Sequence, residues 1–327
     1  MNDSELNQLI LQARQLTRRR FGKVIQLYAP LYLSNECVDT CTYCGFSLAN
    51  RIPRKTLSPS EVREEAQALI DQGIQHLLLV SGEHPVHVST DYLAEVIRLL
   101  RPHFASLSIE VAPLKKEEYR KLIDAGLDGV VLYQEAYDRE RYEAVHLAGP
   151  KKSYDKRLLA PEEAAEAGIR FLGMGILLGL ADWPQEIEAL VRHVRKLRQK
   201  HWQTEFTISL PRLRDCASDF DVPFPVSNHD FIEMIARLRI ALPEVGIVLS
   251  TRESPALRDF LIGMGVTQMS AGSKTEPGGY LHPEENLKQF EIEDARTVKE
   301  ISTMIESKGY EPIYKDWEPH YENKMDR

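Results

Sequence analysis

Eight short runs of mainly apolar residues recur along the chain up to residue 271, and stretches with helical spacing separate them. The runs span residues 24–33, 74–81, 107–111, 129–133, 169–178, 205–210, 246–250 and 266–271. Strands that are apolar almost throughout are typical of a parallel sheet covered by helices on both faces. The pattern therefore predicts a chain in which strands and helices alternate.

The stretches between these runs carry signals of helix boundaries. Ser58 and Glu61 have the spacing of a capping box, Pro59 suits the first helical position, and Gly73 marks the end of that helix. By similar signals, we predict further helices over residues 182–201, 227–242 and 254–263. Each of these helices would connect two consecutive strands.

Eight strands with helices between them predict a (β/α)8 TIM-type barrel of the α/β class. We expect a single domain over residues 1–327, because no linker rich in Gly, Ser or Pro divides the chain. Within it, the N-terminal helix would span 1–22, the barrel core 23–275 and a C-terminal extension 276–327. A doubly wound open sheet is the alternative.

With 43% hydrophobic and 28% charged residues, the chain has enough apolar side chains for a large core. Its formal net charge of −8 argues against nucleic acid as the main partner, because phosphate binding needs a basic surface. No apolar run reaches the length of a membrane span, and the first residues lack the basic and apolar parts of a signal peptide. We therefore expect a cytoplasmic protein without a membrane partner.

Polar residues follow nearly every predicted strand. In a barrel, the C-terminal ends of the strands surround the active site, so residues there are candidates for chemistry. They lie at residues 81–84, 133–135, 209–214, 250–253 and 270–274, and a group of cysteines follows the first strand. Polar side chains that converge from separate strands are hard to explain as packing, so we predict a reaction site at this end.

Three of the four cysteines, Cys37, Cys41 and Cys44, lie within eight residues. In a reducing compartment such a group more often binds metal than forms disulfides. Zinc would need a fourth ligand, for which Asp39, Cys216 or a histidine are the candidates. An iron–sulfur cubane held by three thiolates would instead keep one iron open for an exogenous ligand. By itself, Cys216 is expected to be a small buried hydrophobic residue.

The motif Cys-x-x-x-Cys-x-Tyr-Cys-Gly-Phe, followed by a glycine–glutamate turn after the second strand, resembles the cluster loop of the radical S-adenosylmethionine (SAM) superfamily. From about Leu16 onward, the chain also resembles one family within it, the tyrosine lyases that form 2-iminoacetate for thiamine biosynthesis. The segments that carry this resemblance are 31–35, 44–47, 50–51, 54–57, 77–80, 82–84, 133–135, 211–214, 249–254, 273–275, 277–280 and 315–317.

The resemblance implies that the three clustered cysteines hold a 4Fe-4S cluster, whose open iron binds the amino and carboxylate groups of S-adenosyl-L-methionine. Backbone atoms beside Tyr43 would contact the adenine of SAM. Gly82 would allow close approach of the backbone, and Glu83 would accept hydrogen bonds from the SAM ammonium group. The chain departs from the pattern at Ser81, where many members of the superfamily carry glycine.

Glu135 and Arg157 would complete the SAM site by the same resemblance. Glu135 would be a further contact to SAM, and Arg157 would pair with the methionine carboxylate. Each residue has an alternative role. Glu135 at a strand end could cap the next helix, and Arg157 could be an ordinary surface charge.

A free amino acid as substrate needs a fixed cation for its carboxylate, and the planar fork of arginine binds carboxylates through two hydrogen bonds. Arg252 is the first candidate, because it lies where the seventh strand reaches the barrel mouth. The second candidate and the expected hydrogen-bonding partners are Arg212, Ser270 and Ser209. The alternative for Arg252 is a structural ion pair with Glu253 or Asp259.

For function, the resemblance implies that SAM is cleaved to methionine and a 5′-deoxyadenosyl radical, which takes a hydrogen atom from the amino group of L-tyrosine. Rupture of the Cα–Cβ bond then yields 2-iminoacetate (dehydroglycine) and 4-cresol. The implied partners are an external electron donor of the flavodoxin or ferredoxin type and thiazole synthase. The rivals are a tryptophan lyase and the hydrogenase-maturation tyrosine lyase, which carries later cysteines that are absent after Cys216 here. From a different class, the alternative is a zinc-stapled barrel without radical chemistry.

Overall fold

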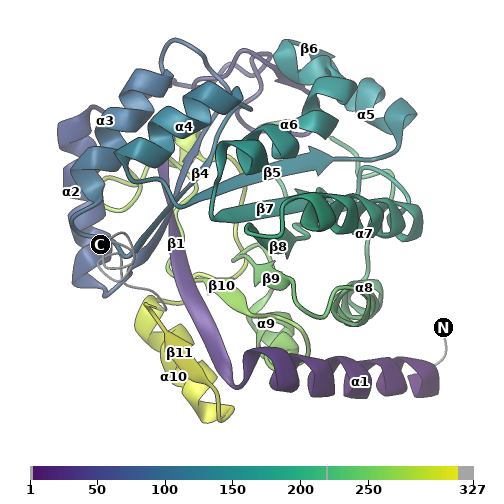
Figure 1. Ribbon diagram of the computed structural model, residues 1–327. Coiled ribbons are helices and arrows are strands. Elements are labelled where there is room, and N and C mark those ends of the chain that lie inside the picture. Colours follow the sequence, from purple (N-terminus) through teal and green to yellow (C-terminus); the bar gives the residue numbers. More distant parts are fainter. Residues whose placement is uncertain (1–2, 219, 316–327) are drawn as a thin grey trace.

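Eight parallel strands close into a barrel in the computed structural model, which describes residues 3–218 and 220–315. In spatial order these strands are β1 (Val24–Ser34), β3 (His76–Ser81), β4 (Ser106–Glu110), β5 (Gly129–Glu135), β7 (Phe171–Ile176), β8 (Glu205–Ser209), β9 (Gly246–Leu249) and β10 (Gln268–Ser270). The sheet closes because β10 pairs in parallel with β1, with Leu27 opposite Met269 (Figure 1). The predicted (β/α)8 barrel is confirmed, and the open doubly wound sheet is wrong.

Each predicted strand overlaps one strand of the barrel, but three short strands were not predicted. The strand β11 (Glu311–Ile313) lies beside the start of β1, with Ile25 opposite Pro312. The strands β2 (Thr40–Cys41) and β6 (His146–Ala148) form a separate antiparallel pair. All three are too short to produce an apolar run. Of the terminal segments expected from the sequence, residues 1–2 and 316–327, with Asp316 and Trp317, lie outside the described part of the chain.

Helices surround the barrel and fill the connections between its strands (Figure 1). They are α1 (Asp3–Phe21), α2 (Pro59–Asp71), α3 (Thr90–Leu100), α4 (Lys116–Ala125), α5 (Arg139–Val145), α6 (Tyr154–Ala167), α7 (Trp183–Lys200), α8 (Asn228–Ala241), α9 (Pro255–Leu261) and α10 (Val298–Ser307), with the 3-10 turns η1 (Pro150–Lys152) and η2 (Glu285–Leu287). The predicted capping box of α2 is present, since the Glu61 carboxylate accepts the Ser58 N–H at 2.8 Å.

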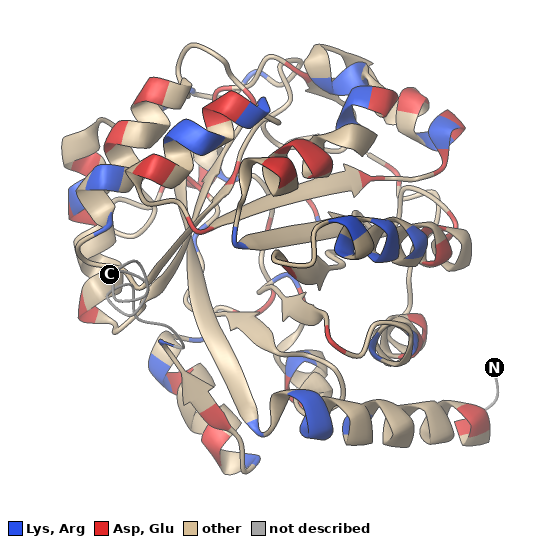
Figure 2. Ribbon diagram, in the orientation of Figure 1, with Lys and Arg blue, Asp and Glu red and all other residues tan. Residues whose placement is uncertain are grey.

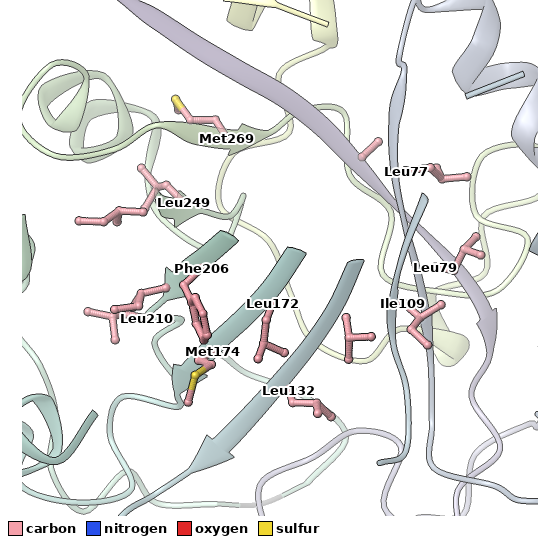
Figure 3. Close-up of a cluster of buried hydrophobic side chains, with 14 of the residues drawn as sticks. Leu77, Leu79, Ile109, Leu132, Leu172, Met174, Phe206, Leu210, Leu249 and Met269 are labelled. Carbon is pink, nitrogen blue, oxygen red and sulfur yellow. The ribbon is translucent and has the colours of Figure 1, made fainter. Parts of the chain in front are cut away.

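The main hydrophobic core contains residues from the barrel strands and from the surrounding helices, and Figure 3 shows some of its side chains, among them Leu77, Leu132 and Leu172. Along β4, Leu107 and Ile109 belong to this core, whereas Ser106, Ser108 and Glu110 line a cavity inside the barrel. This division follows from the alternation of side chains along a strand. The barrel interior is therefore partly polar and hollow, unlike the packed layers of Val, Ile and Leu usual in this fold.

Charged side chains of both signs lie mainly on the outer helices and loops, while the strands are mostly uncharged (Figure 2). The long helix α7 carries several lysines and arginines along its outer face (Figure 2). Within the described ranges, no helix combines the length and the apolar composition that crossing a membrane requires.

Candidate active site

The carboxyl ends of the barrel strands enclose a cavity of about 160 Å³, which we call the chamber. Most of the site residues that the sequence predicts line its wall, although they come from segments far apart along the chain. These residues are Cys37, Cys41, Tyr43, Cys44, Gly82, Glu83, Glu135, Arg157, Arg252 and Ser270. The closed barrel thus brings the expected cluster loop, SAM residues and substrate arginine around one space.

The cysteine loop follows β1 and is held by hydrogen bonds from other segments. The Arg54 guanidinium donates to the backbone carbonyls of Asn35 at 2.6 Å and Phe46 at 2.8 Å. The Val38 N–H donates to the Glu83 carbonyl at 3.0 Å and so ties the loop to the turn after β3. These bonds fix the path of the loop, so that its sulfur atoms face the chamber.

All three clustered cysteines are free thiols on the chamber wall. Burial raises the pKa of the Cys37 thiol to about 11, and burial likewise raises the pKa of Cys41 and of Cys44. Such thiols do not ionise near neutral pH on their own. These thiols are therefore not reactive as free groups near neutral pH, and a bound metal centre would be needed to hold them as thiolates.

The spacing of the sulfur atoms fits a cluster better than a single zinc ion. A tetrahedral zinc ion with bonds of about 2.3 Å holds its sulfur ligands about 3.8 Å apart. Among the described residues, ligand atoms gathered within 4.8 Å of one another are found at Glu36, His84 and His87, and the three cysteines form no such set. A cubane spreads its cysteine ligands more widely than one ion does, so the residues present fit an iron–sulfur cluster.

Two of the fourth ligands considered for zinc are engaged elsewhere. The Asp39 carboxylate accepts the Lys151 N–H at 2.8 Å. The half-buried Cys216 thiol donates to the Tyr43 carbonyl at 3.4 Å. Cys216 therefore packs against the cysteine loop from outside, and it does not line the chamber.

A network of buried charges joins the SAM residues predicted from the sequence. Glu83 pairs with Arg157 at 2.9 Å and with Lys151 at 3.4 Å, and Glu135 pairs with Lys151 at 2.8 Å. Burial disfavours the charged forms of Glu83 and Glu135, but the two cations outweigh it and hold the pKa of both carboxyls below the usual value. Both glutamates are therefore anionic and able to accept hydrogen bonds.

The alternatives for Glu135 and Arg157 do not match their surroundings. The N-cap of α5 is Asp138, so Glu135 does not cap that helix. Only 6% of the Arg157 side chain is exposed, so Arg157 is not a surface charge. Glu135 also has a φ of +68°, a left-handed conformation that costs a non-glycine residue on the order of 1–3 kcal/mol and often occurs at functional sites.

Gly82 lies where the turn after β3 meets the cysteine loop. A Cβ atom at this position would lie 2.3 Å from the Glu36 carbonyl oxygen, closer than any real contact. We expect the Gly82→Ala variant to lose about 1–3 kcal/mol of unfolding free energy and to bind less iron, because the cysteine loop must move. Denaturant unfolding and iron analysis test this, and an alanine variant with the stability and iron content of the parent would contradict it.

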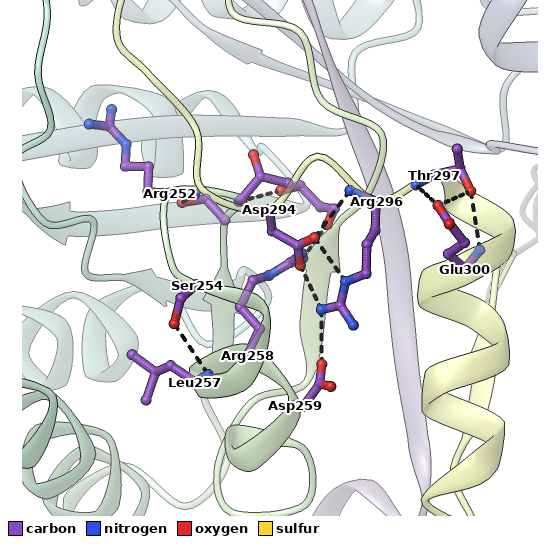
Figure 4. A network of polar contacts seen from close by, with 12 residues as sticks. Arg252, Ser254, Leu257, Arg258, Asp259, Asp294, Arg296, Thr297 and Glu300 are labelled. Atoms are coloured by element: carbon purple, nitrogen blue, oxygen red, sulfur yellow. Dashed lines mark hydrogen bonds and ion pairs between the residues drawn. The ribbon is translucent and has the colours of Figure 1, made fainter.

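Arg252 contributes an unpaired cation to the chamber wall. Its guanidinium carbon lies 3.3 Å from the centroid of the Phe290 ring, and no ion pair of Arg252 occurs among the residues described. Its two suspected partners bind other arginines instead. Glu253 pairs with Arg214 at 3.1 Å, and Asp259 pairs with Arg296 at 2.9 Å. Figure 4 shows the Arg252 side chain pointing away from the network around Arg296.

The two remaining predicted residues, Arg212 and Ser209, do not line the chamber. The Arg212 Nε donates to Glu253 at 2.9 Å, and its Nη1 donates to the Val226 carbonyl at 3.0 Å. These bonds occupy the guanidinium of Arg212 and hold it away from the substrate space. Ser209 lines the second cavity, deeper in the barrel. The structure therefore gives the carboxylate-binding role no support from Arg212.

Two charged residues of the chamber are not among those that the sequence predicts for the site. Lys151 lies in η1, outside any strand end, and no local pattern marks it. Glu110 is the last residue of β4, and the alternation of Ser106, Ser108 and Glu110 along that strand was the available signal. The predicted run of 107–111 is treated only as a mainly apolar strand, so the prediction does not single out Glu110.

Comparison with known proteins agrees with this geometry. Residues 31–208 match the Radical SAM superfamily, and residues 209–311 match the Biotin and Thiamin Synthesis associated domain. The 2-iminoacetate synthase of Escherichia coli K12 is 41% identical over 316 residues, which are 96% of this chain and 84% of that protein. The same enzyme of Salmonella typhimurium is 40% identical over 314 residues, 96% of this chain and 83% of that protein.

Among solved structures, the FeFe-hydrogenase maturase HydG of Carboxydothermus hydrogenoformans superposes with a TM-score of 0.91 and 39% identity, covering 96% of this chain and 73% of that one. The superfamily binds an iron–sulfur cluster and SAM, which agrees with the cysteine loop and the charged wall of the chamber. The chain therefore belongs to the radical SAM superfamily and, within it, to the family of the 2-iminoacetate synthases.

Proposed function

We propose that this protein is a lyase that cleaves the Cα–Cβ bond of L-tyrosine to 2-iminoacetate and 4-cresol, for thiazole formation in thiamine biosynthesis. Identity of about 40% to two 2-iminoacetate synthases over nearly the whole chain supports this activity. The observation that carries the proposal is that the cysteine loop and Arg252, which has no ion pair among the described residues, line the same cavity.

Cys37, Cys41 and Cys44 would hold the cluster, which we propose to be of the 4Fe-4S type. Three ligands leave one iron of such a cluster open, and the superfamily match implies that SAM binds there. When bound, the reduced cluster and SAM would supply a 5′-deoxyadenosyl radical able to take a hydrogen atom from the tyrosine amino group, which the chamber residues would hold in place. The walls of the barrel mouth would shield that radical from part of the bulk water.

The charged wall of the chamber would position SAM. Glu83 and Glu135, both anionic, are suited to accept hydrogen bonds from the ammonium and hydroxyl groups of SAM. Arg157 and Lys151, which pair with Glu83 and Glu135 here, would also bind the methionine carboxylate of SAM. Backbone atoms beside Tyr43 and the small Gly82 would let SAM lie close to the main chain.

Arg252 would bind the carboxylate of tyrosine, with Ser270 beside it. The Ser270 hydroxyl accepts the Thr251 N–H at 3.1 Å and so links the end of β10 to the segment that carries Arg252. We expect Arg252→Lys to raise the KM for tyrosine at least about tenfold, equal to about 1.4 kcal/mol, because lysine lacks the two-pronged geometry. The control is Arg237→Lys on the outer face of α8, and an Arg252→Lys enzyme with unchanged KM would contradict the assignment.

We also infer partners and location from this function. The reaction needs an external one-electron donor, for which a flavodoxin or ferredoxin is suited. The imine product is unstable in water, so direct transfer to thiazole synthase in a complex would protect it. Clustered free thiols suit the reducing cytoplasm.

One preparation tests the proposal against its rivals. The protein is purified without oxygen, its iron and sulfide are measured, and it is incubated with SAM, a reductant and either tyrosine or tryptophan. We expect a brown protein that forms 4-cresol from tyrosine and no indole product from tryptophan. A colourless protein that binds only zinc would contradict the proposal, as would lyase activity confined to tryptophan.

A further inference from the structure

The carboxylates on the chamber wall differ in whether they have hydrogen-bond or ion-pair partners. Asp39 accepts a backbone N–H, Glu83 pairs with Arg157 and Lys151, and Glu135 pairs with Lys151. Glu110 also lines the chamber, yet across the described ranges no hydrogen bond or ion pair involves its side chain. The second oxygen of Asp39 is also without a hydrogen bond, but Glu110 is the chamber carboxylate, among the residues described, that has no partner on either oxygen.

The position of Glu110 relates it to Arg252. Glu110 ends β4, and Arg252 follows β9. Four strand steps separate β4 from β9 in either direction around the closed barrel of eight, by way of β5, β7 and β8 or of β3, β1 and β10. Both residues line the chamber, so they approach it from opposite sides of the barrel. The unpaired anion and the unpaired cation of the wall thus lie on opposite sides of one space.

An α-amino acid carries the complementary charges on neighbouring atoms. Its carboxylate suits a guanidinium, and its ammonium group suits a carboxylate. If the site matched only one of these two charges, the other would lose its hydration without compensation, and binding would weaken. The phenol of a tyrosine needs no such charge, since it is neutral at physiological pH. Two unpaired residues of opposite charge are therefore better suited to bind the ammonium and carboxylate groups of the amino acid than its phenol ring.

We propose that Glu110 binds the α-ammonium group of the substrate while Arg252 binds its carboxylate, so that the head of the amino acid spans the chamber between β4 and β9. This inference rests on the proposed function, because it assumes an amino acid substrate. It places the amino nitrogen, from which the hydrogen atom is taken, at the side of the chamber opposite Arg252. It also makes Glu110 a determinant of specificity for amino acids over acids that lack the amino group.

The titration of Glu110 gives an independent readout. Burial raises the pKa of the Glu110 carboxyl to about 7, although the Arg252 charge opposes this rise. The other ionisable groups that act on or lie near Glu110 are Glu135, Lys151, Arg157, Tyr28, Tyr32 and Tyr133. Because the pKa is raised, Glu110 is anionic above about pH 7 and loses its charge as the pH falls below that value. Binding of the ammonium group should weaken in the same direction.

The test measures binding to the anaerobic holoenzyme with SAM and without reductant, so that no turnover occurs. Calorimetric Kd values are compared for tyrosine and for 3-(4-hydroxyphenyl)propanoate, which lacks the amino group. We expect Glu110→Gln to weaken tyrosine binding at least about tenfold and to leave the amino-free acid within about twofold of the parent. Arg252→Lys is expected to weaken both ligands. Glu110→Asp, which keeps the charge, should retain most of the preference for tyrosine.

The pH dependence provides the second arm. Parent enzyme should lose about tenfold in tyrosine affinity from about pH 8 to about pH 6, and Glu110→Gln should not. Equal binding of tyrosine by parent and Glu110→Gln would overturn the inference. Equal weakening of tyrosine and amino-free acid binding would also overturn it, because Glu110 would then contact the phenol or support the fold. Iron content and melting temperature would distinguish these two roles, since only loss of a structural role lowers them. A parent enzyme that binds no tyrosine would instead refute the proposed function.

Discussion

Replacing Cys41 with alanine is expected to remove most of the bound iron and to abolish SAM cleavage. Cys41 is one of three thiols that face the chamber, and a cluster with only two protein ligands is held far less firmly. Iron and sulfide analysis after anaerobic reconstitution measures the first effect. Formation of 5′-deoxyadenosine, with reductant and with or without tyrosine, measures the second.

Cys216→Ala is the matched control for this substitution. Cys216 touches the cysteine loop through the Tyr43 carbonyl, but it does not line the chamber. Its loss should therefore leave iron content and SAM cleavage near those of the parent protein. A Cys41→Ala protein that retains full iron, or a Cys216→Ala protein that loses it, would show that the cluster is bound by a different set of cysteines.

The second large effect is expected from Arg258→Met. Arg258 and Asp294 form an ion pair in which both side chains are fully buried, and the Arg258 guanidinium also donates to the Ser270 carbonyl (Figure 4). The substitution leaves Asp294 buried with one cation fewer. Removing one partner of a buried pair typically costs about 3–5 kcal/mol, so the free energy of unfolding should fall by that amount.

Denaturant unfolding of both proteins measures this loss. Arg192→Met is the control, because the Arg192–Glu188 pair lies on an exposed helix face with 65% and 72% of the two side chains accessible. An exposed pair of this kind contributes about 0.3–0.5 kcal/mol. If Arg258→Met were no more destabilising than Arg192→Met, Arg296, which also pairs with Asp294 at 2.7 Å, would be sufficient to neutralise that carboxylate.

The Arg258 pair also bears on the chamber. Asp294 lies beyond the last barrel strand, and its pair with Arg258 ties that later segment to the carbonyl at the end of β10. Ser270 in turn positions the Thr251 N–H next to Arg252. The buried Arg258–Asp294 pair therefore supports the backbone that carries Arg252. This role gives a reason for an ion pair whose burial has a high desolvation cost.

Several features of this protein follow from its sequence alone. Each of the eight barrel strands could be predicted, because strands buried in a parallel sheet are mainly apolar, and that composition can be recognised locally. The capping box at Ser58 and Glu61 is local for the same reason, since its bonds join residues three apart. The grouping of Cys37, Cys41 and Cys44 also depends only on short-range spacing, so it indicates a metal site without reference to the fold.

Other features depend on contacts between distant segments. Closure of the sheet rests on the pairing of β1 with β10, which no local pattern encodes. The sequence offers both Arg252, as first candidate, and Arg212, as second, for the substrate carboxylate. In the folded protein Arg212 pairs with Glu253, whereas Arg252 lines the chamber. Lys151 enters the charged wall from a 3-10 turn, and Glu110 stands opposite Arg252 only because the barrel closes. The sequence alone thus determined the strands and the cysteine loop. Tertiary structure decided which charged side chains form ion pairs and which do not, because pairing depends on distances that are set only when the barrel closes.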